Sequence, residues 1–224
     1  MPSNAGRAPP RAWLSRPRGR AAAVAATDER LKSHFNRSSV SLRRLKTDYV
    51  DLLLIHWPNG AVPLAETLKA MEGLRQDGRA RVIGVSNFSS ALVKQAVEEL
   101  GATLFCNQVE YHVLLSQKRL LDTMRAKGMI LTAYSPLAQG RLPGHSTLQG
   151  VGRKYGKTAA QVALRWLIGQ DKVAAIPRST SEARAKANLE VFDFELAPED
   201  MAAIDALQGN TRTINPTWAP EWDK

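Results

Sequence analysis

The chain has 224 residues, enough for one domain, and its single cysteine, Cys106, excludes an internal disulfide framework and favours a reducing compartment. Its net charge of +10 suggests nucleic-acid binding, but residues 1–46 hold 11 Lys and Arg against only Asp28 and Glu29, and the remainder is nearly neutral. No apolar run approaches the roughly 20 residues of a membrane span. We therefore expect a cytoplasmic protein that binds neither nucleic acid nor membranes.

Residues 1–27 form a basic leader whose composition differs from that of the rest of the chain. Ala, Arg, Pro, Gly and Ser dominate it, and no acidic residue precedes Asp28. Such a segment buries too little apolar surface to offset the entropy of ordering it, so we expect it to be disordered. An organelle-targeting segment and a weak polyanion-binding arm are alternatives, but prolines at positions 9, 10 and 17 would interrupt a targeting helix. We favour a non-functional extension.

Residues 28–224 alternate between helical and strand patterns. A helix is predicted over 28–46, and residues 49–58 (YVDLLLIHWP) then form an apolar run with no helical period. Such a run predicts a strand that is buried on both faces, as parallel strands are between layers of helices. His56 ends this strand. Because active sites lie at the carboxyl ends of parallel strands, His56 is either part of such a site or a core or turn histidine.

The same alternation continues to residue 207. Repeated strand and helix units imply a parallel sheet with right-handed crossovers. Five strands are visible, too few to close an eight-stranded barrel. Further strands are predicted at 81–85, 104–111, 129–133 and 173–176, and helices from 64 to the Asp77-Gly78 pair and at 89–100, 118–127, 158–168, 181–190 and 198–207, with a loop at 211–224.

Each predicted strand ends in polar or aromatic side chains. In a parallel sheet these ends lie along one edge, so residues far apart in the sequence converge there. Amide and hydroxyl groups can hold a planar carboxamide, an aromatic ring can stack on a pyridine ring, and arginine can bind phosphate. Taken singly, Ser86 and Asn87 could cap the next helix, Tyr134 could belong to the core, and Arg178 could be a solvated charge. The residues at the strand ends are His56, Ser86, Asn87, Gln108, Tyr134, Ser135, Arg178 and Ser179.

At these residues the chain resembles the aldo-keto reductases, a (β/α)8-barrel family that uses NADPH or NADH without a Gly-rich dinucleotide fingerprint. The matching stretches are DYVDLLLIHWP, GVSNF, NQVEYH, AYSPLAQG and IPRSTSEARAKANLEVFDFEL, over about residues 38–224. The closing APEWD and the short loops are similar to the bacterial 2,5-diketo-gluconate reductase branch. The resemblance implies a TIM barrel of this α/β type, incomplete here because the first three strands are absent.

The resemblance implies hydride transfer from NADPH, with NADH possible, to small aldehydes, ketones or keto-sugar acids. His56 would be the histidine of the catalytic tetrad and would position the substrate carbonyl. Ser86, Asn87 and Gln108 would hold the nicotinamide carboxamide, and Tyr134 would stack on the nicotinamide ring. No metal site is implied.

The resemblance also assigns residues to the rest of the dinucleotide and to the substrate. Ser135 and Leu137 would line the pyrophosphate path. Arg178 stands where many members have Lys, so a forked donor would replace a point charge, and Ala187 stands where many have Glu, which removes one hydrogen bond on the adenine side. The positions that hold the 2′-phosphate and adenine are Arg178, Ser179, Arg184 and Asn188. Substrate choice would depend on Trp57, Trp218 and Trp222.

Three groups of the family's catalytic tetrad have no counterpart here. Its Tyr general acid, Lys and Asp come from the first three strands, whereas no Tyr, Lys or Asp precedes Asp28. Tyr49 lies at the wrong end of its strand, and Tyr111 or a water would substitute only poorly. The alternative is therefore a non-catalytic NADP(H)-binding protein or an inactive truncated fragment.

We hypothesise that residues 28–224 are the C-terminal five-eighths of a reductase, preceded by a foreign or mistranslated leader. Intact members of the family are expected to be monomers. The truncated sheet would have open edges beside the His56 strand and the Arg178 strand. Such edges pair with other chains, so association or aggregation is expected for this chain.

Overall fold

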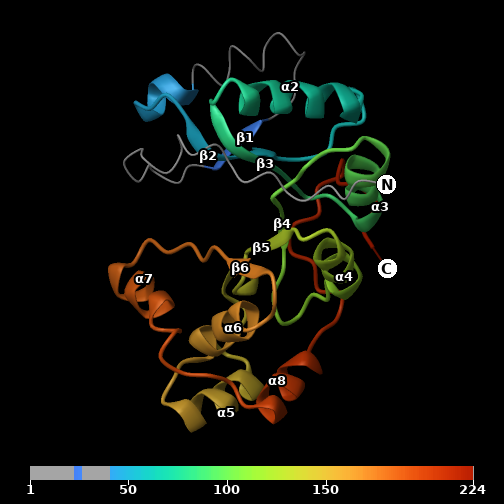
Figure 1. The fold of residues 1–224 in the computed structure, drawn as a ribbon. Coiled ribbons are helices and arrows are strands. Elements are labelled where there is room, and N and C mark those ends of the chain that lie inside the picture. Colours follow the sequence, from blue (N-terminus) through green and yellow to red (C-terminus); the bar gives the residue numbers. More distant parts are fainter. Residues whose placement is uncertain (1–22, 27–40, 224) are drawn as a thin grey trace.

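A parallel sheet lies at the centre of the protein (Figure 1), for which a computed structural model describes residues 23–26 and 41–223. Each strand pairs with the next one along the chain, so the order in the sheet is the order in the sequence. The carboxyl ends of all strands therefore share one edge. The strands are β1 (Ala23–Ala26), β2 (Val50–Ile55), β3 (Ala80–Ser86), β4 (Cys106–Glu110), β5 (Ile130–Tyr134) and β6 (Val173–Ala175).

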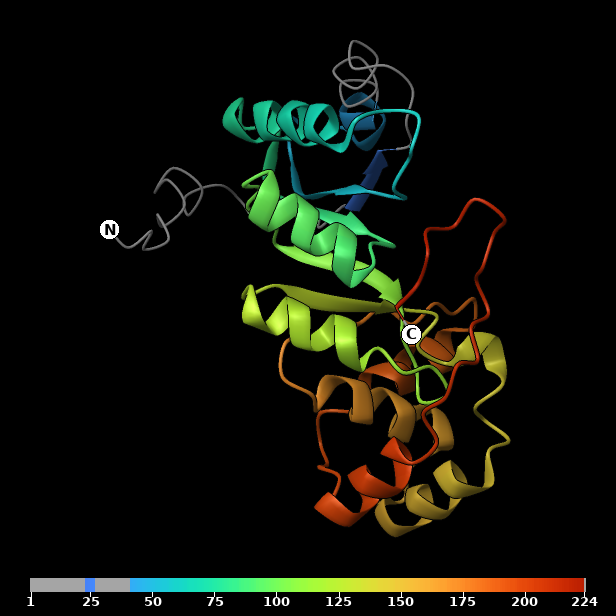
Figure 2. The ribbon, with the colours of Figure 1, turned by 90° about the vertical axis from the view of Figure 1, so that its right-hand side faces the viewer.

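Helices connect the strands from β2 onward and cover the sheet. Figure 2 shows α2, α3 and α4 stacked along one side of the strands, with the C-terminal segment running past the strand ends. None of the helices in the described ranges is long and apolar enough to cross a membrane. The helices are α2 (Leu64–Gln76), α3 (Ser90–Lys94), the π-helix η2 (Gln95–Glu99), α4 (Lys118–Ala126), the 3-10 helix η3 (Ala138–Gly140), α5 (Ser146–Tyr155), α6 (Ala159–Ile168), α7 (Glu182–Leu189) and α8 (Pro198–Asp205).

The core forms where the predicted apolar faces meet. Leu53 and Ile55 of β2 are buried, and so are Leu68, Met71 and Leu74 on one face of α2. Gly78 follows α2 with a φ of 75°, the left-handed conformation that glycine adopts without a steric penalty. The predicted strand and helix at residues 49–78 are therefore confirmed.

The strand β1 differs from what the sequence predicted. Residues 23–26 pair in parallel with β2, from Ala23 opposite Leu52 to Ala26 opposite Ile55, so the sheet has six strands among the described residues instead of five. The edge beside the His56 strand is therefore occupied, because strand pairing needs only backbone donors and acceptors, which a short Ala/Val segment supplies. The rest of the 1–27 leader, like residues 28–40 of the predicted first helix, lies outside the described residues.

No helix was predicted between residues 133 and 158, where the structure has α5. Gly150 and Gly152 lie inside it, and glycine lowers helix propensity by about 1 kcal/mol relative to alanine. The tertiary structure requires Gly152, since a Cβ there would lie 2.3 Å from the carbonyl oxygen of Lys157. Close packing between α5 and the turn that follows it thus outweighs the local preference.

The start of α6 provides a test of stability. Thr158 Oγ1 accepts a hydrogen bond from the Gln161 amide, and Gln161 Oε1 accepts one from the Thr158 amide, which together form a capping box. We expect Thr158→Ala to lower the free energy of unfolding by about 1 kcal/mol in urea denaturation. Thr158→Ser keeps the hydroxyl and is the matched control; equal stability of both variants would contradict the role of this cap.

Candidate functional site

Asn87 connects the ends of four strands. Its Nδ2 donates to the His56 carbonyl at 2.9 Å and to Ser86 Oγ at 3.1 Å, and its Oδ1 accepts a hydrogen bond from the Tyr134 hydroxyl at 2.8 Å. The Asn87 amide also donates to the Gln108 carbonyl at 3.0 Å. The structure thus brings together five of the residues that the sequence placed in one site.

The exposure of these residues changes across the cluster. Ser86 and Asn87 are buried, Gln108 and Tyr134 are partly buried, and His56 is exposed at the end of β2. Ser86 Oγ donates to the backbone carbonyl of Gln108 at 2.7 Å, and the Gln108 side-chain amide forms no hydrogen bond with another described residue. The cluster therefore has a buried inner part, formed by Ser86 and Asn87, and a more accessible outer part with the Gln108 amide and the His56 imidazole.

Residues with positive φ follow two of the strands. Asn87 has φ 62°, Ser135 has φ 46°, and Ala138 has φ 48°. The left-handed region costs most L-residues roughly 1 kcal/mol or more, and asparagine tolerates it best. Such conformations persist where surrounding contacts impose them, and they often accompany binding sites. The loop after β5, which contains Ser135 and the partly buried Leu137, thus has a fixed and unusual course next to the cluster.

Three tyrosines lie near the sheet, and the hydroxyls of two of them donate hydrogen bonds to other side chains. Tyr134 donates to Asn87, and burial together with the nearby Glu110 carboxylate raises the pKa of Tyr134 well above its usual range. Tyr111 donates to Gln170 at 2.8 Å, and burial raises its pKa to about 12 despite this hydrogen bond. Tyr49 directly precedes β2, at the end opposite to His56, as predicted. None of the three is suited to give up a proton beside His56.

A second group of predicted residues surrounds the start of α7. Ser181 Oγ accepts a hydrogen bond from the Arg184 amide, and the Ser181 amide donates to Ser179 Oγ at 3.1 Å, so the turn after β6 is well defined. Arg178 and Arg184 are exposed and form no ion pair with another described residue. Helix N-termini and free guanidinium groups both favour anions. Partly buried Asn188 lies one turn further along α7.

Two charged side chains, Glu110 and Arg212, lie near the end of β4 and were not assigned a role from the sequence. Glu110, at the end of β4, is fully buried and accepts hydrogen bonds from the backbone amides of Thr213 at 2.8 Å and Ile214 at 3.0 Å, as well as from the Thr213 hydroxyl. Burial pushes the pKa of Glu110 upward, but the hydrogen bonds from His112, Thr213 and Ile214 outweigh it and hold this pKa below its usual range. Arg212 Nη1 lies 3.9 Å from the Glu110 carboxylate. The acidic residue in NQVEYH was the only signal in the sequence.

Three tryptophans meet beside His56. The rings of Trp57 and Trp218 make an edge contact with centroids 4.8 Å apart, and those of Trp57 and Trp222 are 6.1 Å apart. Arg212 lies over the Trp222 ring, 3.8 Å from its centroid. The predicted substrate residues are therefore in one place, and the C-terminal segment brings two of them there.

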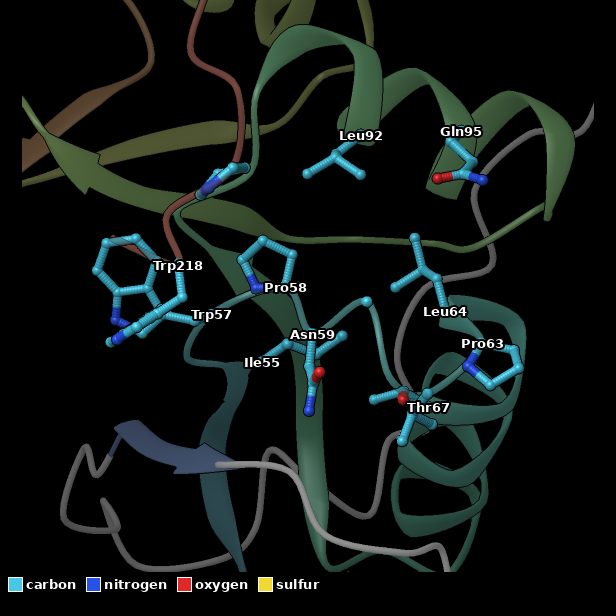
Figure 3. A pocket seen from close by; sticks show the side chains of 13 residues that line it. Ile55, Trp57, Pro58, Asn59, Pro63, Leu64, Thr67, Leu92, Gln95 and Trp218 are labelled. Atoms are coloured by element: carbon cyan, nitrogen blue, oxygen red, sulfur yellow. The ribbon is translucent and has the colours of Figure 1, made fainter. Parts of the chain in front are cut away.

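A cavity of about 410 Å³ opens next to these tryptophans (Figure 3). Trp57 and Trp218 stand on one side of it, and Leu64 and Thr67 of α2 stand on the other. Leu92 and Gln95, from α3 and η2, line a third side. The lining is mostly apolar with a few amide and hydroxyl groups, as in small-molecule sites.

The sequence of the chain is similar to those of known proteins. The model of the family described as "Aldo/keto reductase family" matches residues 20–208. A glyoxal reductase of Bacillus subtilis is 44% identical over 172 residues, which cover 77% of this chain and 62% of the relative. An aldo-keto reductase of Mycobacterium sp. (strain KMS) is 43% identical with the same coverage. The chain thus spans less than two thirds of the length of these curated relatives.

A solved structure has the same fold. A crystal structure named as a 2,5-diketo-D-gluconic acid reductase B superimposes with a TM-score of 0.85 at 44% identity, over 87% of this chain and 70% of that one. This likeness confirms the expected (β/α)8-type fold. The barrel is incomplete among the described residues, as expected, because no pairing joins β1 to β6. A variant of Gox0644 in complex with NADPH is 31% identical, with a TM-score of 0.77, over 82% of this chain and 68% of that one.

Proposed function

Since the chain belongs to the aldo/keto reductase family, we propose that it is an oxidoreductase that binds NADPH and reduces small carbonyl compounds. The observation that carries the proposal is the Asn87-centred cluster at the carboxyl ends of β2 to β5, next to the exposed imidazole of His56. Aldehydes, ketones and keto-sugar acids are the proposed substrates, supported by the names of the glyoxal and diketogluconate reductase relatives.

The residues present fit a nicotinamide dinucleotide. Ser86, Asn87 and Gln108 would hold the carboxamide, and the Gln108 amide has no competing hydrogen bond among the described residues. Tyr134, with its hydroxyl fixed on Asn87, would present its ring to the nicotinamide. When bound, the cofactor supplies a hydride. His56 would hold the substrate carbonyl oxygen by a hydrogen bond and so orient the carbon for attack.

The other end of the cofactor would lie on the turn between β6 and α7. Ser135 and Leu137 would flank the pyrophosphate. Arg178 and Arg184, both exposed, would bind the 2′-phosphate, and the preference for NADPH over NADH is proposed on this ground. Ser179 and Asn188 would complete the adenosine site.

A second candidate function, dinucleotide binding without turnover, is favoured by the tyrosines. The chain has 4 tyrosines. Tyr111 donates to Gln170, Tyr134 to Asn87, and Tyr155 to Asp200, while Tyr49 lies at the far end of β2. A general acid contributes roughly 10²- to 10⁴-fold to such reactions, so turnover that relies on these tyrosines would be slow.

Titration of NADPH fluorescence tests the proposal. We expect binding by the wild-type chain and a roughly tenfold weaker affinity for Gln108→Ala, with unchanged stability, because the amide bonds to no other described residue. Gln76→Ala, on the exposed face of α2, is the matched control. Binding with glyoxal turnover supports the reductase, and binding without turnover supports the second candidate. A folded chain that binds no NADPH would contradict both.

A further inference from the structure

The C-terminal segment, residues 213–223, is attached to the rest of the protein at both of its ends. At one end Glu110 accepts the backbone hydrogen bonds of Thr213 and Ile214. At the other end Asp223 is held by Ser90, 133 positions earlier in the chain. The eight residues between these two anchors, 215–222, carry the tryptophans that lie beside Trp57.

The second anchor is a carboxylate that takes the place of a helix cap. Asp223 Oδ2 accepts hydrogen bonds from the Ser90 amide at 2.9 Å and from Ser90 Oγ at 2.8 Å. Ser89, at the N-cap position of α3, makes no side-chain cap hydrogen bond, so Asp223 satisfies a donor that the helix itself leaves open. The Asp223 side chain is 17% exposed, and Arg119 lies 4.0 Å from its other oxygen.

The position of Trp218 depends on these anchors more than on burial. Trp218 is 61% exposed, although it forms part of the cavity wall together with Pro220. A side chain with so much exposed surface gains little from packing, so its place is set by the course of the backbone. Asn215 supports that course by accepting a hydrogen bond from the Trp222 indole at 2.8 Å.

We propose that Asp223 is a positioning residue for the three tryptophans beside His56, which form a wall of the proposed substrate site. Through its two hydrogen bonds to Ser90 it holds Trp218 against Trp57 and thereby sets the affinity for carbonyl substrates with an aromatic or bulky group. Small dicarbonyl compounds lack such a group, so their affinity is expected to stay unchanged. The part that concerns substrates rests on the proposed function, whereas the structural part does not.

Fluorine NMR of the protein labelled with 5-fluorotryptophan tests the structural part without any activity. We expect the Trp218 and Trp222 resonances, assigned through Trp218→Phe and Trp222→Phe, to shift and narrow in Asp223→Ala, while the buried Trp166 resonance stays unchanged. Asp223→Asn keeps one acceptor oxygen and should restore most of the wild-type spectrum. Glu221→Gln, which removes an exposed carboxylate from the same segment, is the matched control. Unchanged Trp218 and Trp222 resonances in Asp223→Ala would overturn the proposal.

Steady-state kinetics test the substrate part. We expect Asp223→Ala to raise KM for phenylglyoxal roughly tenfold while kcat, the KM for glyoxal and the affinity for NADPH stay within about twofold. A merely structural role would lower kcat, the NADPH affinity and the melting temperature together and would raise the KM for glyoxal as well, and that outcome would contradict positioning. If Asp223→Ala does not fold, Ser90→Ala, which removes one of the two hydrogen bonds, is measured in its place. Absence of turnover in the wild type would contradict the reductase function alone, since the NMR result stands without it.

Discussion

Replacement of Glu110 by alanine is expected to lower the free energy of unfolding by about 3 to 5 kcal/mol, the range for breaking a buried charge pair. The carboxylate is fully buried, and its loss leaves the amides of Thr213 and Ile214 without acceptors. It also leaves the guanidinium of Arg212, with a side chain only 13% exposed, without its nearest anion. Urea denaturation monitored by circular dichroism measures the effect.

The matched control for this prediction is a carboxylate on the surface. Glu195 is 90% exposed and lies 3.4 Å from Arg165, so Glu195→Ala should change stability by no more than about 1 kcal/mol. Glu110→Ala combined with Arg212→Ala should be less destabilised than the sum of the two single variants, because the two residues interact. Similar effects of Glu110→Ala and Glu195→Ala would show that the buried carboxylate has no special role.

The same carboxylate should make stability depend on pH. Hydrogen bonds hold the pKa of Glu110 in the folded protein below its value in the unfolded chain. The stabilisation is therefore fully present above the unfolded-state pKa, about 4.3, and is lost as the pH falls through the lower folded-state pKa. Glu110→Gln should flatten the acid limb of a plot of unfolding free energy against pH, and an acid limb identical to that of the wild type would contradict this assignment.

Replacement of Arg178 and Arg184 by alanine is expected to weaken NADPH binding by about 10- to 100-fold for each arginine, since hydrogen bonds to charged groups contribute about 1.5 to 3 kcal/mol. Both side chains are exposed and make no ion pair within the described part of the chain, so stability should not change. NADH affinity should also stay the same, because NADH lacks the 2′-phosphate. Fluorescence titration with both cofactors separates these effects.

Lys186 provides the control for the arginines. It is exposed on α7, two positions from Arg184, and residues two apart on a helix do not face each other. Lys186→Ala should therefore bind NADPH as the wild type does. An equal loss of NADPH and NADH affinity in the arginine variants would mean that these residues support the fold of the turn and do not bind the 2′-phosphate.

Much of the sheet could be predicted because each element has its own local signal. The apolar run of β2, the helical spacing of Leu68, Met71 and Leu74, and Gly78 after α2 each act within a few residues of the chain. The motifs at the strand ends identified His56, Ser86, Asn87, Gln108 and Tyr134 as neighbours. The hydrogen bonds of Asn87 connect all of these residues.

The strand β1 and the helix α5 could not be predicted, because their local sequences carry no signal for them. The strand β1 has a composition that resembles a disordered segment, and it is defined by its pairing with β2. Helix α5 contains two glycines, and the contact of Gly152 with the turn at Lys157 becomes visible only in three dimensions. In both cases a tertiary contact overrides a weak local preference.

By itself the sequence determined the alternation of strands and helices, the family resemblance and the residues at the strand ends, because periodicity and motif residues are properties of short segments. Only the tertiary structure decided how the C-terminal segment is attached. Asp223 meets Ser90, and Glu110 meets Thr213 and Ile214, across more than a hundred positions of the chain. Such pairs leave no pattern in the sequence, since a carboxylate and its donors become partners only when the sheet brings them together.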